Sequence, residues 1–591
     1  MSGTGPARAA PAPDARITDR RWVSRSDTTA EPATVDALRS ALGLPEALCR
    51  LLVVRGHADA ESVRSFMRPG LDALHDPLLL ADMDRAVARL VRAIEGGERI
   101  LAHGDYDVDG ICSAVLFTRV LRSLGADIEP FVPHRVTDGY DLGSAGVGKA
   151  AGAGAGLILT GDCGTVAFDA IAQAAAAGID VIVTDHHTPG AVLPPAVAVV
   201  NPGRPDCAYP FKGLAGAGVA FKLCEAMVAA LGGDRDALLW HLDLVALATI
   251  ADLAPLRGEN RVMAHFGLRV LRETRNPGLR ALMDGAGVDT AEPLTAGQVS
   301  HVLAPRLNAV GRMGAASRGV RLLLSDDAAE AASLAAEMES ENRSRQAVDR
   351  QILDEALAML EAGFEPERDY AVVLSSTGWH PGVIGIVASR VVERIHRPVV
   401  LIAEDRTAGR GRGSARSIPA FHLYDGIHAC APLLERYGGH RQAAGLELRL
   451  DRLDAFRAAL NAHARTVLQP ADLVPEVYVD LEIRLAEADG ELFRLTRHCG
   501  PFGLGNPQPV FMVRDVGIRG YPREVGAGQH LKLVLAQDDV ALPAIGFRLA
   551  DRLRRIDVGR TRLDVAFHLH EDRWNGRSEL QARLVDLRSA S

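Results

Sequence analysis

The segment HGDYDVDG, residues 103–110, places one histidine and three aspartates close together at the edge of an apolar region. The apolar runs ERILA and ICSAVLF lie on either side of it. Like charges side by side in such a position are costly unless a cation neutralises them. A solvated turn is the simpler alternative, because Asp and Gly favour turns. The segment therefore predicts either a turn or a metal site.

Two further clusters of ionisable residues follow predicted strands. GLILTG runs into Asp162, and DVIVT runs into Asp185, His186 and His187. In a parallel sheet the carboxyl ends of all strands lie at one edge, which is where α/β sheets bind ligands. Asp252, in the apolar stretch ALATIADLAPL, also needs a partner. We therefore expect these groups to meet residues 103–110 in space.

The combined set is more informative than its members, since one Asp or His after a strand is usually a cap or turn residue. Imidazole and carboxylate together suit Mn²⁺ or Mg²⁺. The number of ligands suffices for two ions that share a bridging carboxylate. Two ions roughly 3.5–4 Å apart hydrolyse phosphate esters or anhydrides. The sequence thus predicts a two-metal phosphohydrolase site.

The surrounding pattern predicts an α/β protein with several domains, since 591 residues exceed one hydrophobic core. Short β-branched runs alternate with helical runs from residue 99 to about 256, and again from 370, which is typical of βαβ units. The charged stretch 325–363 could be one helix that links two lobes, or an ordinary solvated helix. Short alternating runs near the C-terminus indicate a small β-barrel or sandwich. The expected divisions are a disordered tail (1–30), a helical segment (31–95), a catalytic α/β domain (96–265), a helical region with the connecting helix (266–365), a second α/β domain (366–465) and the β-rich domain (466–591).

Composition restricts the partners and the compartment. The net charge is −9, so a nucleic-acid partner would need a local basic groove. Seven cysteines without a CxxC pair indicate neither a disulfide framework nor a zinc site, and a reducing cytoplasm fits. The Pro/Ala-rich N-terminus has no apolar core for a signal peptide, and no apolar run is long enough for a membrane span.

The motifs HGDYDVDG, DCG (162–164), TDHH (184–187) and ATIADLAPL occur in the order found in the DHH phosphoesterase superfamily. The sequence most resembles its RecJ family of single-stranded-DNA-specific exonucleases. Further RecJ-like segments are PHRVTDGYDL (133–142), APRLNAVGRM (304–313), HPGVIGIVASR (380–390), GSARSI (413–418), GGHRQAAG (438–445) and CGPFGLGNPQPVF (499–511). The resemblance extends from about residue 45 to the C-terminus. It implies a DHH domain, a DHHA1 domain and a C-terminal domain like an oligonucleotide-binding (OB) fold.

The resemblance also implies roles for the clustered residues. His103 and Asp107 would bind one metal, Asp162 would bridge both, and Asp109, His186 and Asp252 would complete the second site. His187 would contact the scissile phosphate and help the leaving oxygen depart. Asp105 and Asp185 would orient ligands, although Asp105, counted with His187 and Asp162 as catalytic, could instead be a ligand. Gly161 departs from the pattern, because many relatives carry a bulkier residue there.

Substrate contacts are expected from three segments. The residues expected to hold a terminal 5′-phosphate are Arg306, Asn308, Arg312, Ser414 and Arg416. In the DHHA1 domain, Gly438, Gly439 and His440 would approach substrate phosphates. On the β-rich domain, Lys532 is the expected contact, with Tyr521, His530, Phe547 and Arg548 as further candidates.

The implied activity is a 5′→3′ exonuclease that releases 5′-mononucleotides from single-stranded DNA with two Mn²⁺, or Mg²⁺, in recombination and repair. The implied partners are a single-strand-binding protein and a helicase, and no membrane is expected. Two alternatives remain. One is a DHH hydrolase of short oligonucleotides, cyclic dinucleotides or pyrophosphate. The other is a non-catalytic single-strand-binding relative that acts as a scaffold.

Overall fold

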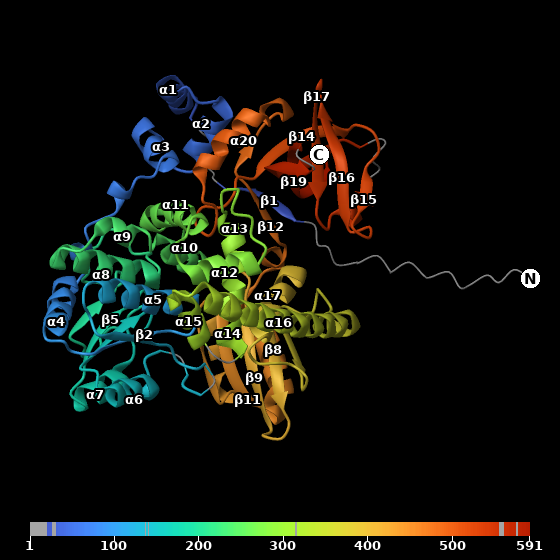
Figure 1. Cartoon of the computed structure of the whole chain (residues 1–591). Coiled ribbons are helices and arrows are strands. Elements are labelled where there is room, and N and C mark those ends of the chain that lie inside the picture. The colour runs from blue at the N-terminus through green and yellow to red at the C-terminus, as the bar shows by residue number, and fades with distance from the viewer. Residues whose placement is uncertain are drawn as a thin grey trace, which may run out of the picture. The chain divides into compact units, whose positions relative to one another are not determined.

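The computed structural model describes residues 20–25, 31–135, 137–139, 141–313, 316–554, 561–574 and 577–590 (Figure 1). The chain divides into two compact units. The central unit comprises Ser65–Arg350 and Cys499–Pro507, and the flanking unit comprises Met1–Arg64, Gln351–His498 and Gln508–Ser591. Within the described residues, no helix is both long enough and apolar enough to cross a membrane.

The central unit contains a five-stranded parallel sheet, as predicted. Its strands are β2 (Ile100–Gly104), β3 (Ile128–Phe131), β4 (Leu157–Gly161), β5 (Asp180–Thr184) and β6 (Ala198–Val200). Every residue of β2 and β4 is buried, because helices cover both faces of the sheet. Helices α4 (Met83–Glu95), α5 (Val108–Ser123) and α8 (Gly216–Leu231) pack on one face, and α6 (Ser144–Ala153) and α7 (Phe168–Ala176) pack on the other (Figure 1).

The strand order β3-β2-β4-β5-β6 creates a switch point between β2 and β4. The chain leaves β2 towards β3 on one side and returns to β4 on the other. Ligands of doubly wound sheets bind outside the carboxyl ends of the strands at such a point. The segment after β2 and the segment after β4 therefore meet at the position where this architecture builds sites.

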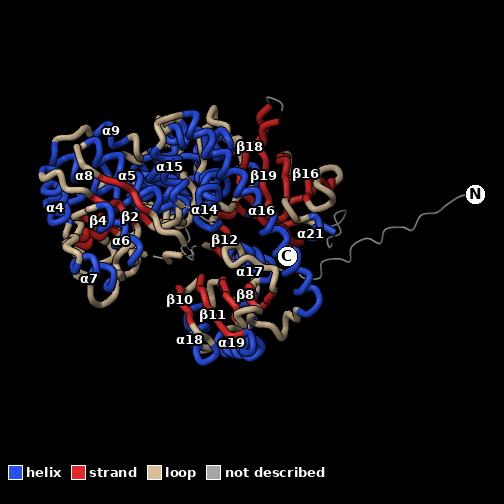
Figure 2. The backbone as a smooth tube through the Cα atoms, turned by 60° about the horizontal axis from the view of Figure 1, so that its bottom comes forward, coloured by secondary structure: helices blue, strands red, loops and turns tan. Residues whose placement is uncertain are grey.

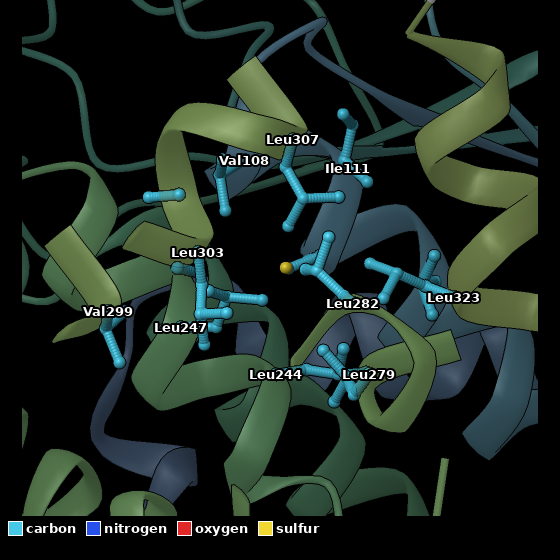
Figure 3. Packing of buried hydrophobic residues seen from close by; sticks show 14 of the residues in the cluster. Val108, Ile111, Leu244, Leu247, Leu279, Leu282, Val299, Leu303, Leu307 and Leu323 are labelled. Carbon is cyan, nitrogen blue, oxygen red and sulfur yellow. The ribbon is translucent and has the colours of Figure 1, made fainter. Parts of the chain in front are cut away.

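A second layer of helices supports α5 from the side away from the sheet. These helices are α10 (Leu242–Ala251), α11 (Gly258–Arg272), α12 (Pro277–Gly285), α13 (Ala296–Gln298), a π-helical turn (Val299–Leu303), α14 (Ala304–Met313) and α15 (Ser317–Leu324), whereas the short helix α9 (Arg235–Leu239) packs against α8. Figure 3 shows Val108 and Ile111 of α5 facing Leu247 of α10 and Leu307 of α14 in this apolar core. The core holds the N-terminus of α5 and the C-terminus of α10 in fixed positions.

The charged stretch after residue 325 forms a single helix, α16 (Ala328–Gly363), of 36 residues. The division between the two units falls within it, after Arg350. This helix therefore belongs to both units, as the linking alternative expects.

The flanking unit contains a mixed sheet in the order β10-β11-β9-β8-β7. Its strands are β7 (Val372–Ser376), β8 (Val399–Asp405), β9 (Arg410–Arg416), β10 (Arg436–Gly439) and β11 (Ala443–Arg449). Figure 2 shows α17 (Ile384–Ile395) on one side of this sheet and α18 (Leu423–His428) and α19 (Leu453–Val467) on the other. The second α/β domain is thus confirmed, with β10 at the edge of the sheet.

The C-terminal strands close into a barrel, as the sequence predicted. They are β13 (Leu481–Glu482), β14 (Phe511–Ile518), β15 (Arg523–Val525), β16 (His530–Gln537), β17 (Val540–Gly546), β18 (Leu563–Trp574) and β19 (Arg577–Ser589). The sheet order is β13-β14-β18-β19-β17-β16-β15, and an additional pairing of β14 with β16 closes the ring. Five strands, β14 and β16–β19, therefore form the closed barrel, which is the strand number of an OB fold. Two short helices, α20 (Gly490–Thr496) and α21 (Ala550–Arg554), accompany it.

The N-terminal region corrects one prediction. Helices α1 (Pro32–Leu42), α2 (Glu46–Val54) and α3 (Ala60–Met67) form where amphipathic helices were expected. However, the disordered tail predicted for residues 1–30 is wrong for β1 (Arg21–Ser24), which pairs in parallel with β12 (Glu476–Val479). Trp22 of β1 packs in the barrel cluster and donates to Asp586, and this distant partner could not be read from local composition. Residues 1–19 and 26–30 lie outside the described part.

Candidate metal centre and substrate-binding surfaces

The loop after β2 is held by the N-terminus of α5. Asp107 caps this helix, because its Oδ1 accepts from the amides of Asp109 at 3.0 Å and Gly110 at 3.1 Å. The chain turns so tightly that a Cβ on Gly110 would lie 2.2 Å from the amide nitrogen of Asp105. The turn interpretation of HGDYDVDG is therefore right for the backbone, and the turn gathers the carboxylates.

Asp109 is fixed by the N-terminus of a second helix. Its Oδ2 accepts from the amide of Gly216, and its Oδ1 accepts from that of Ala217, both at 2.7 Å. These amides open α8, so the helix dipole favours the negative charge. A Cβ on Gly216 would lie 2.6 Å from the Cβ of Asp162, so only glycine fits between the two aspartates.

Asp162 and His186 form the centre of the cluster. The Oδ1 of Asp162 lies 3.0 Å from the Nε2 of His186, and that nitrogen lies 3.9 Å from Asp109 Oδ2 and 3.8 Å from Asp252 Oδ2. Asp162 has a φ of 65°, a strained conformation for a non-glycine residue that is found mainly at functional sites. Four side chains from four segments thus point at one small volume.

The arrangement fits divalent cations. Three sets of side chains have ligand atoms within 4.8 Å of one another: Asp105–Asp107–Asp162, Asp162–His186–His187 and Asp109–His186–Asp252. Within the described residues, His103 Nε2, Asp105 Oδ1, Asp162 Oδ1 and His186 Nε2 are buried without a hydrogen-bond partner. Buried polar atoms normally have partners, and carboxylate with imidazole is a donor set for Mn²⁺ or Mg²⁺. Asp162 and His186 are each shared between two sets, but only the carboxylate, with its two oxygens, can bridge two ions.

His103 behaves differently from the other predicted ligands, because it belongs to none of these sets. Its Nδ1 lies 3.6 Å from Cys163 Sγ, and its Nε2 points at Gly146, where a Cβ would come within 2.6 Å. Burial lowers the pKa of His103 to about 4, so the imidazole is neutral. Asp105, in contrast, occupies a ligand position beside Asp107.

A hydrogen-bond network orients His187. Its Nδ1 donates to Asp185 Oδ1 at 2.8 Å, and its carbonyl accepts from the Asn201 amide at 2.8 Å. Asp185 also accepts from the amides of His186 and Thr165. Burial opposes these bonds, yet they lower the pKa of Asp185 to about 2 and raise the pKa of His187 to about 9. These bonds therefore fix the ring of His187 and favour its protonated form.

Burial and mutual repulsion act together on the acidic cluster. Burial first, and neighbouring carboxylates second, raise the pKa of Asp105 and Asp162 well above the usual range. The same causes raise the pKa of Asp252 to about 8. A cation among these carboxylates would remove the repulsion and keep them ionised.

Three residues that support the site were missed by the sequence reasoning. Asp141, with a φ of 71°, accepts from the amide of Gly164 at 2.6 Å and holds the loop after β4. Asn201 holds the carbonyl of His187, and Gly216 makes room for Asp162. Asp141 lies in the quoted PHRVTDGYDL segment, and Asn201 follows a predicted strand, so both could have been identified from the sequence. Gly161, the noted departure, is required here because its Cβ would lie 2.6 Å from Ser113 Cβ.

The predicted phosphate contacts of the central unit lie on α14. Arg306 donates from Nε to Glu339 at 2.6 Å and from Nη1 to the Val302 carbonyl at 2.5 Å. Asn308 lies one turn away from the start of this helix and is partly buried. The side chain of Arg312 is outside the described part. Arg306 therefore already has an acidic partner with which a phosphate would have to compete.

In the flanking unit, Ser414 and Arg416 lie together on β9 near the N-terminus of α17. Arg416 Nη1 lies 3.3 Å from Ser414 Oγ, and a Cβ on Gly385 would come within 2.8 Å of that hydroxyl. Gly438 pairs with Gly445, which pairs with Ser414, so Gly438 lies in the same cross-strand row. Gly439 and His440 follow it, exposed, at the sheet edge.

On the barrel, three of the predicted contacts lie near one another. The ring of Phe547 packs edge-on against His530 at 5.2 Å, and the amide of Arg548 lies 3.2 Å from His530 Nδ1. Lys532 is exposed on β16. Tyr521, which is 95% exposed, lies in the connection between β14 and β15 and has no ring partner among the described residues.

Family models match three parts of the chain. The DHH family N-terminal domain matches residues 99–249, the DHHA1 domain matches 369–466, and the RecJ OB domain matches 479–586. The single-stranded-DNA-specific exonuclease RecJ of Bacillus subtilis is 37% identical over 554 residues, which cover 93% of this chain and 69% of that protein. The chain belongs to the RecJ family.

Two solved structures of RecJ from Thermus thermophilus share the architecture. The complex with Mn²⁺ has a TM-score of 0.82 at 33% identity and covers 97% of this chain and 80% of that one. The complex with Mg²⁺ has a TM-score of 0.76 at 32% identity, with 97% and 79% covered. The predicted family, the α/β fold with its DHH, DHHA1 and OB-like parts, and the metal-dependent exonuclease class are thus confirmed. The roles of individual side chains remain predictions.

Proposed function

We propose that this RecJ-family chain degrades single-stranded DNA from the 5′ end and releases 5′-mononucleotides with two divalent metal ions. The observation that carries the proposal is the approach of Asp162 and His186 to 3.0 Å at the switch point, with Asp109 and Asp252 beside them. Buried ligand atoms without partners are explained by metal ions and by few other ligands.

Asp109, Asp162, His186 and Asp252 would hold one ion, and Asp162 would bridge to the other. For the second ion, Asp105 and Asp107 are the ligands that the geometry favours, and His103, whose buried Nε2 has no hydrogen-bond partner among the described residues, is the third candidate. Bound there, two ions would activate a water molecule and stabilise the negative charge of the phosphate in the transition state.

His187 would supply the proton. Water attacks the phosphorus atom, and the bond to the 3′-oxygen of the terminal nucleotide breaks. The His187 ring, fixed by Asp185 and Asn201, would donate its proton to that oxygen, so the released nucleotide carries a 3′-hydroxyl. The hydrogen bond from His187 to Asp185 raises the pKa of the ring and favours its protonated form.

The terminal 5′-phosphate would be held by Ser414, Arg416 and the Gly438–His440 segment, with Arg306, Asn308 and Arg312 as further candidates. Guanidinium groups and backbone amides at a helix N-terminus are suited to phosphate. The barrel would bind the strand further along, through Lys532, His530, Phe547 and Arg548. Tyr521 is the weakest of these candidates, since it is isolated.

We further propose Mn²⁺ as the cofactor, with Mg²⁺ as an alternative, and a cytoplasmic role in recombination and repair. A nuclease specific for single strands needs unwound ends, so a helicase and a single-strand-binding protein are the expected partners.

The deciding experiment is digestion of 5′-labelled and 3′-labelled single strands with Mn²⁺ and with Mg²⁺. We expect immediate release of the 5′ label as a mononucleotide, while the 3′-labelled strand shortens gradually. Cleavage restricted to di- to pentanucleotides would favour the short-oligonucleotide hydrolase, and binding without release would favour the non-catalytic relative.

A further inference from the structure

A pocket of about 540 Å³ lies on the barrel, and none of its lining residues takes part in the proposed bond cleavage. The lining residues that matter here are Lys532 (β16), Phe547 (after β17), Asp572 (β18), and Glu579, Gln581 and Arg583 (β19). Only Lys532 and Phe547 were candidates from the sequence. The pocket is thus a separate feature of the barrel surface that needs its own explanation.

Strand register orders the charges across this pocket. Lys532 lies opposite Ile545, which lies opposite Arg583, so the two basic residues share one cross-strand row. Glu579 lies opposite Asp572. Alternate residues of a strand are about 7 Å apart on one face, so Arg583, Gln581 and Glu579 form a line from a basic end to an acidic end.

The polar groups of the pocket are available to a ligand. Gln581 is only 7% exposed, yet its side-chain amide makes no hydrogen bond to another described residue. The side chains of Lys532, Arg583, Asp572 and Glu579 likewise make no ion pair or hydrogen bond with any residue that the structure describes. Like charges directly opposite each other, such as Asp572 and Glu579, destabilise a sheet. The nearly buried amide of Gln581, with the accessible carboxylates beside it, therefore leaves hydrogen-bonding groups free for a ligand.

The acidic end and the basic end of the pocket together restrict the kind of ligand that can bind. Two carboxylates repel a phosphate or an acidic peptide, but they accept hydrogen bonds from N–H groups. Phe547 offers a ring for stacking, with the Arg583 guanidinium 5.2 Å from its centre. A ligand that combines a flat ring, several N–H donors and an attached anion matches the whole pocket. A nucleotide within a single strand has all three.

We propose that this pocket binds a guanine base of single-stranded DNA, with its Watson–Crick edge towards Asp572 and Glu579. Guanine presents two adjacent donors on that edge, N1–H and the 2-amino group, whereas the other bases present one. Gln581 can pair with either donors or acceptors of the base. Lys532 and Arg583 contact the sugar-phosphate backbone at the other end. This inference rests on the proposed action on single-stranded DNA and adds a base preference to it.

The test uses the full-length protein in a chelator, so that the strand is bound but not cut. The probes are fluorescent oligo-dT strands with one central dG, inosine, dA, dC or dT, and fluorescence anisotropy gives the affinity for each. Inosine lacks only the 2-amino group. We expect the dG strand to bind about fivefold or more tightly than the dT strand, with inosine in between.

The variant Asp572→Asn/Glu579→Gln should lose this preference. Its affinity for all strands can rise, because negative charge is removed, so the dG to dT ratio is the quantity to compare. Glu571→Gln is the matched control, since the neighbouring carboxylate on β18 faces the other way and bonds to Arg573 and Ser578. It should keep the wild-type ratio.

Equal affinity of the wild type for all strands would overturn the proposal, and so would a preference that survives in the double variant. Digestion of the dT strand with Mn²⁺ separates this result from the activity. Mononucleotide release without a base preference removes the pocket assignment and leaves the exonuclease. If the strands are neither bound nor cut, both proposals fail.

Discussion

Two clusters of ionisable groups, one at the carboxyl edge of the central sheet and one on the face of the barrel, differ in burial and in the signs of their charges. At the sheet edge, Asp105, Asp109 and Asp162 are buried together, and two of them leave an oxygen without a partner. On the barrel, Asp572 and Glu579 are partly or fully accessible and share their pocket with Lys532 and Arg583. The first cluster requires a cation, whereas the second already contains both signs of charge.

The difference also concerns what holds each group. The sheet-edge carboxylates are positioned by helix N-termini, since Asp107 caps α5 and Asp109 accepts from two amides of α8. The barrel groups are positioned only by strand register. A rigid, buried site suits bond cleavage, where small displacements reduce the rate greatly. An accessible site of mixed charge suits binding of a strand that must also move on.

The largest effect should follow Asp162→Ala, which removes the shared ligand. We expect turnover to fall by roughly 1,000-fold or more, because both proposed ions lose a bond. Affinity for single strands in a chelator should change little, since the barrel is unaltered. Nucleotide release and anisotropy measure the two properties. Near-normal release would refute the bridging role and remove the contrast between the two clusters.

A smaller effect is expected from Gly216→Ala, which adds a methyl group beside the Asp162 side chain. Its Cβ would lie 2.6 Å from Asp162 Cβ, so the carboxylate must move, and Mn²⁺ affinity should fall about 10–100-fold. Gly218→Ala is the matched control on the same helix, because its nearest neighbour is the flexible end of Met263 at 3.3 Å. Mn²⁺ titration by calorimetry checks both variants. Equal affinities would show that α8 does not position the site.

The same contrast explains what could be read from the sequence. The metal cluster was predictable because strand ends, Asp and His form a local pattern, and a parallel sheet brings such ends to one edge. His103 fitted the motif, but its ring direction depends on Cys163 and Gly146, which belong to other segments. The barrel pocket was not predictable. It depends on the pairing of β16, β17, β18 and β19, and register across distant strands leaves no local signal.

For the barrel, Phe547→Leu compares the two candidate aromatic residues. Removing a stacking ring costs about 1–3 kcal/mol per base, so single-strand affinity should fall about fivefold or more. Tyr521→Leu should have a much smaller effect, because Tyr521 is isolated, whereas Phe547 is flanked by His530 and Arg583. Anisotropy in a chelator checks both. A larger loss in the Tyr521 variant would contradict the assignment of Phe547 as the stacking residue.

Asp243 offers a third case for comparison, since it is a buried carboxylate that is compensated by hydrogen bonds and by the charge of Arg119, without a cluster of other carboxylates. It accepts from the Leu244 amide at 2.7 Å and from the Thr274 hydroxyl at 2.5 Å, yet burial raises its pKa to about 6. A raised pKa means that the folded state binds the proton more tightly than the unfolded chain. Asp243 therefore stabilises the fold below about pH 4, and this contribution is lost as the pH rises through about 6.

Asp243→Asn removes this titration and keeps the shape of the side chain. The gain in the free energy of unfolding relative to wild type should be about 2–3 kcal/mol larger at pH 7 than at pH 4. Activity should not change, because Asp243 lies at the N-terminal end of α10 and Asp252 follows the other end. Thermal unfolding at several pH values gives the dependence. A difference that does not vary with pH would mean that hydrogen bonds and the charge of Arg119 suffice to keep this buried carboxylate ionised. The unpartnered oxygens of Asp105 and Asp162 would then be the reason why the sheet edge needs a metal.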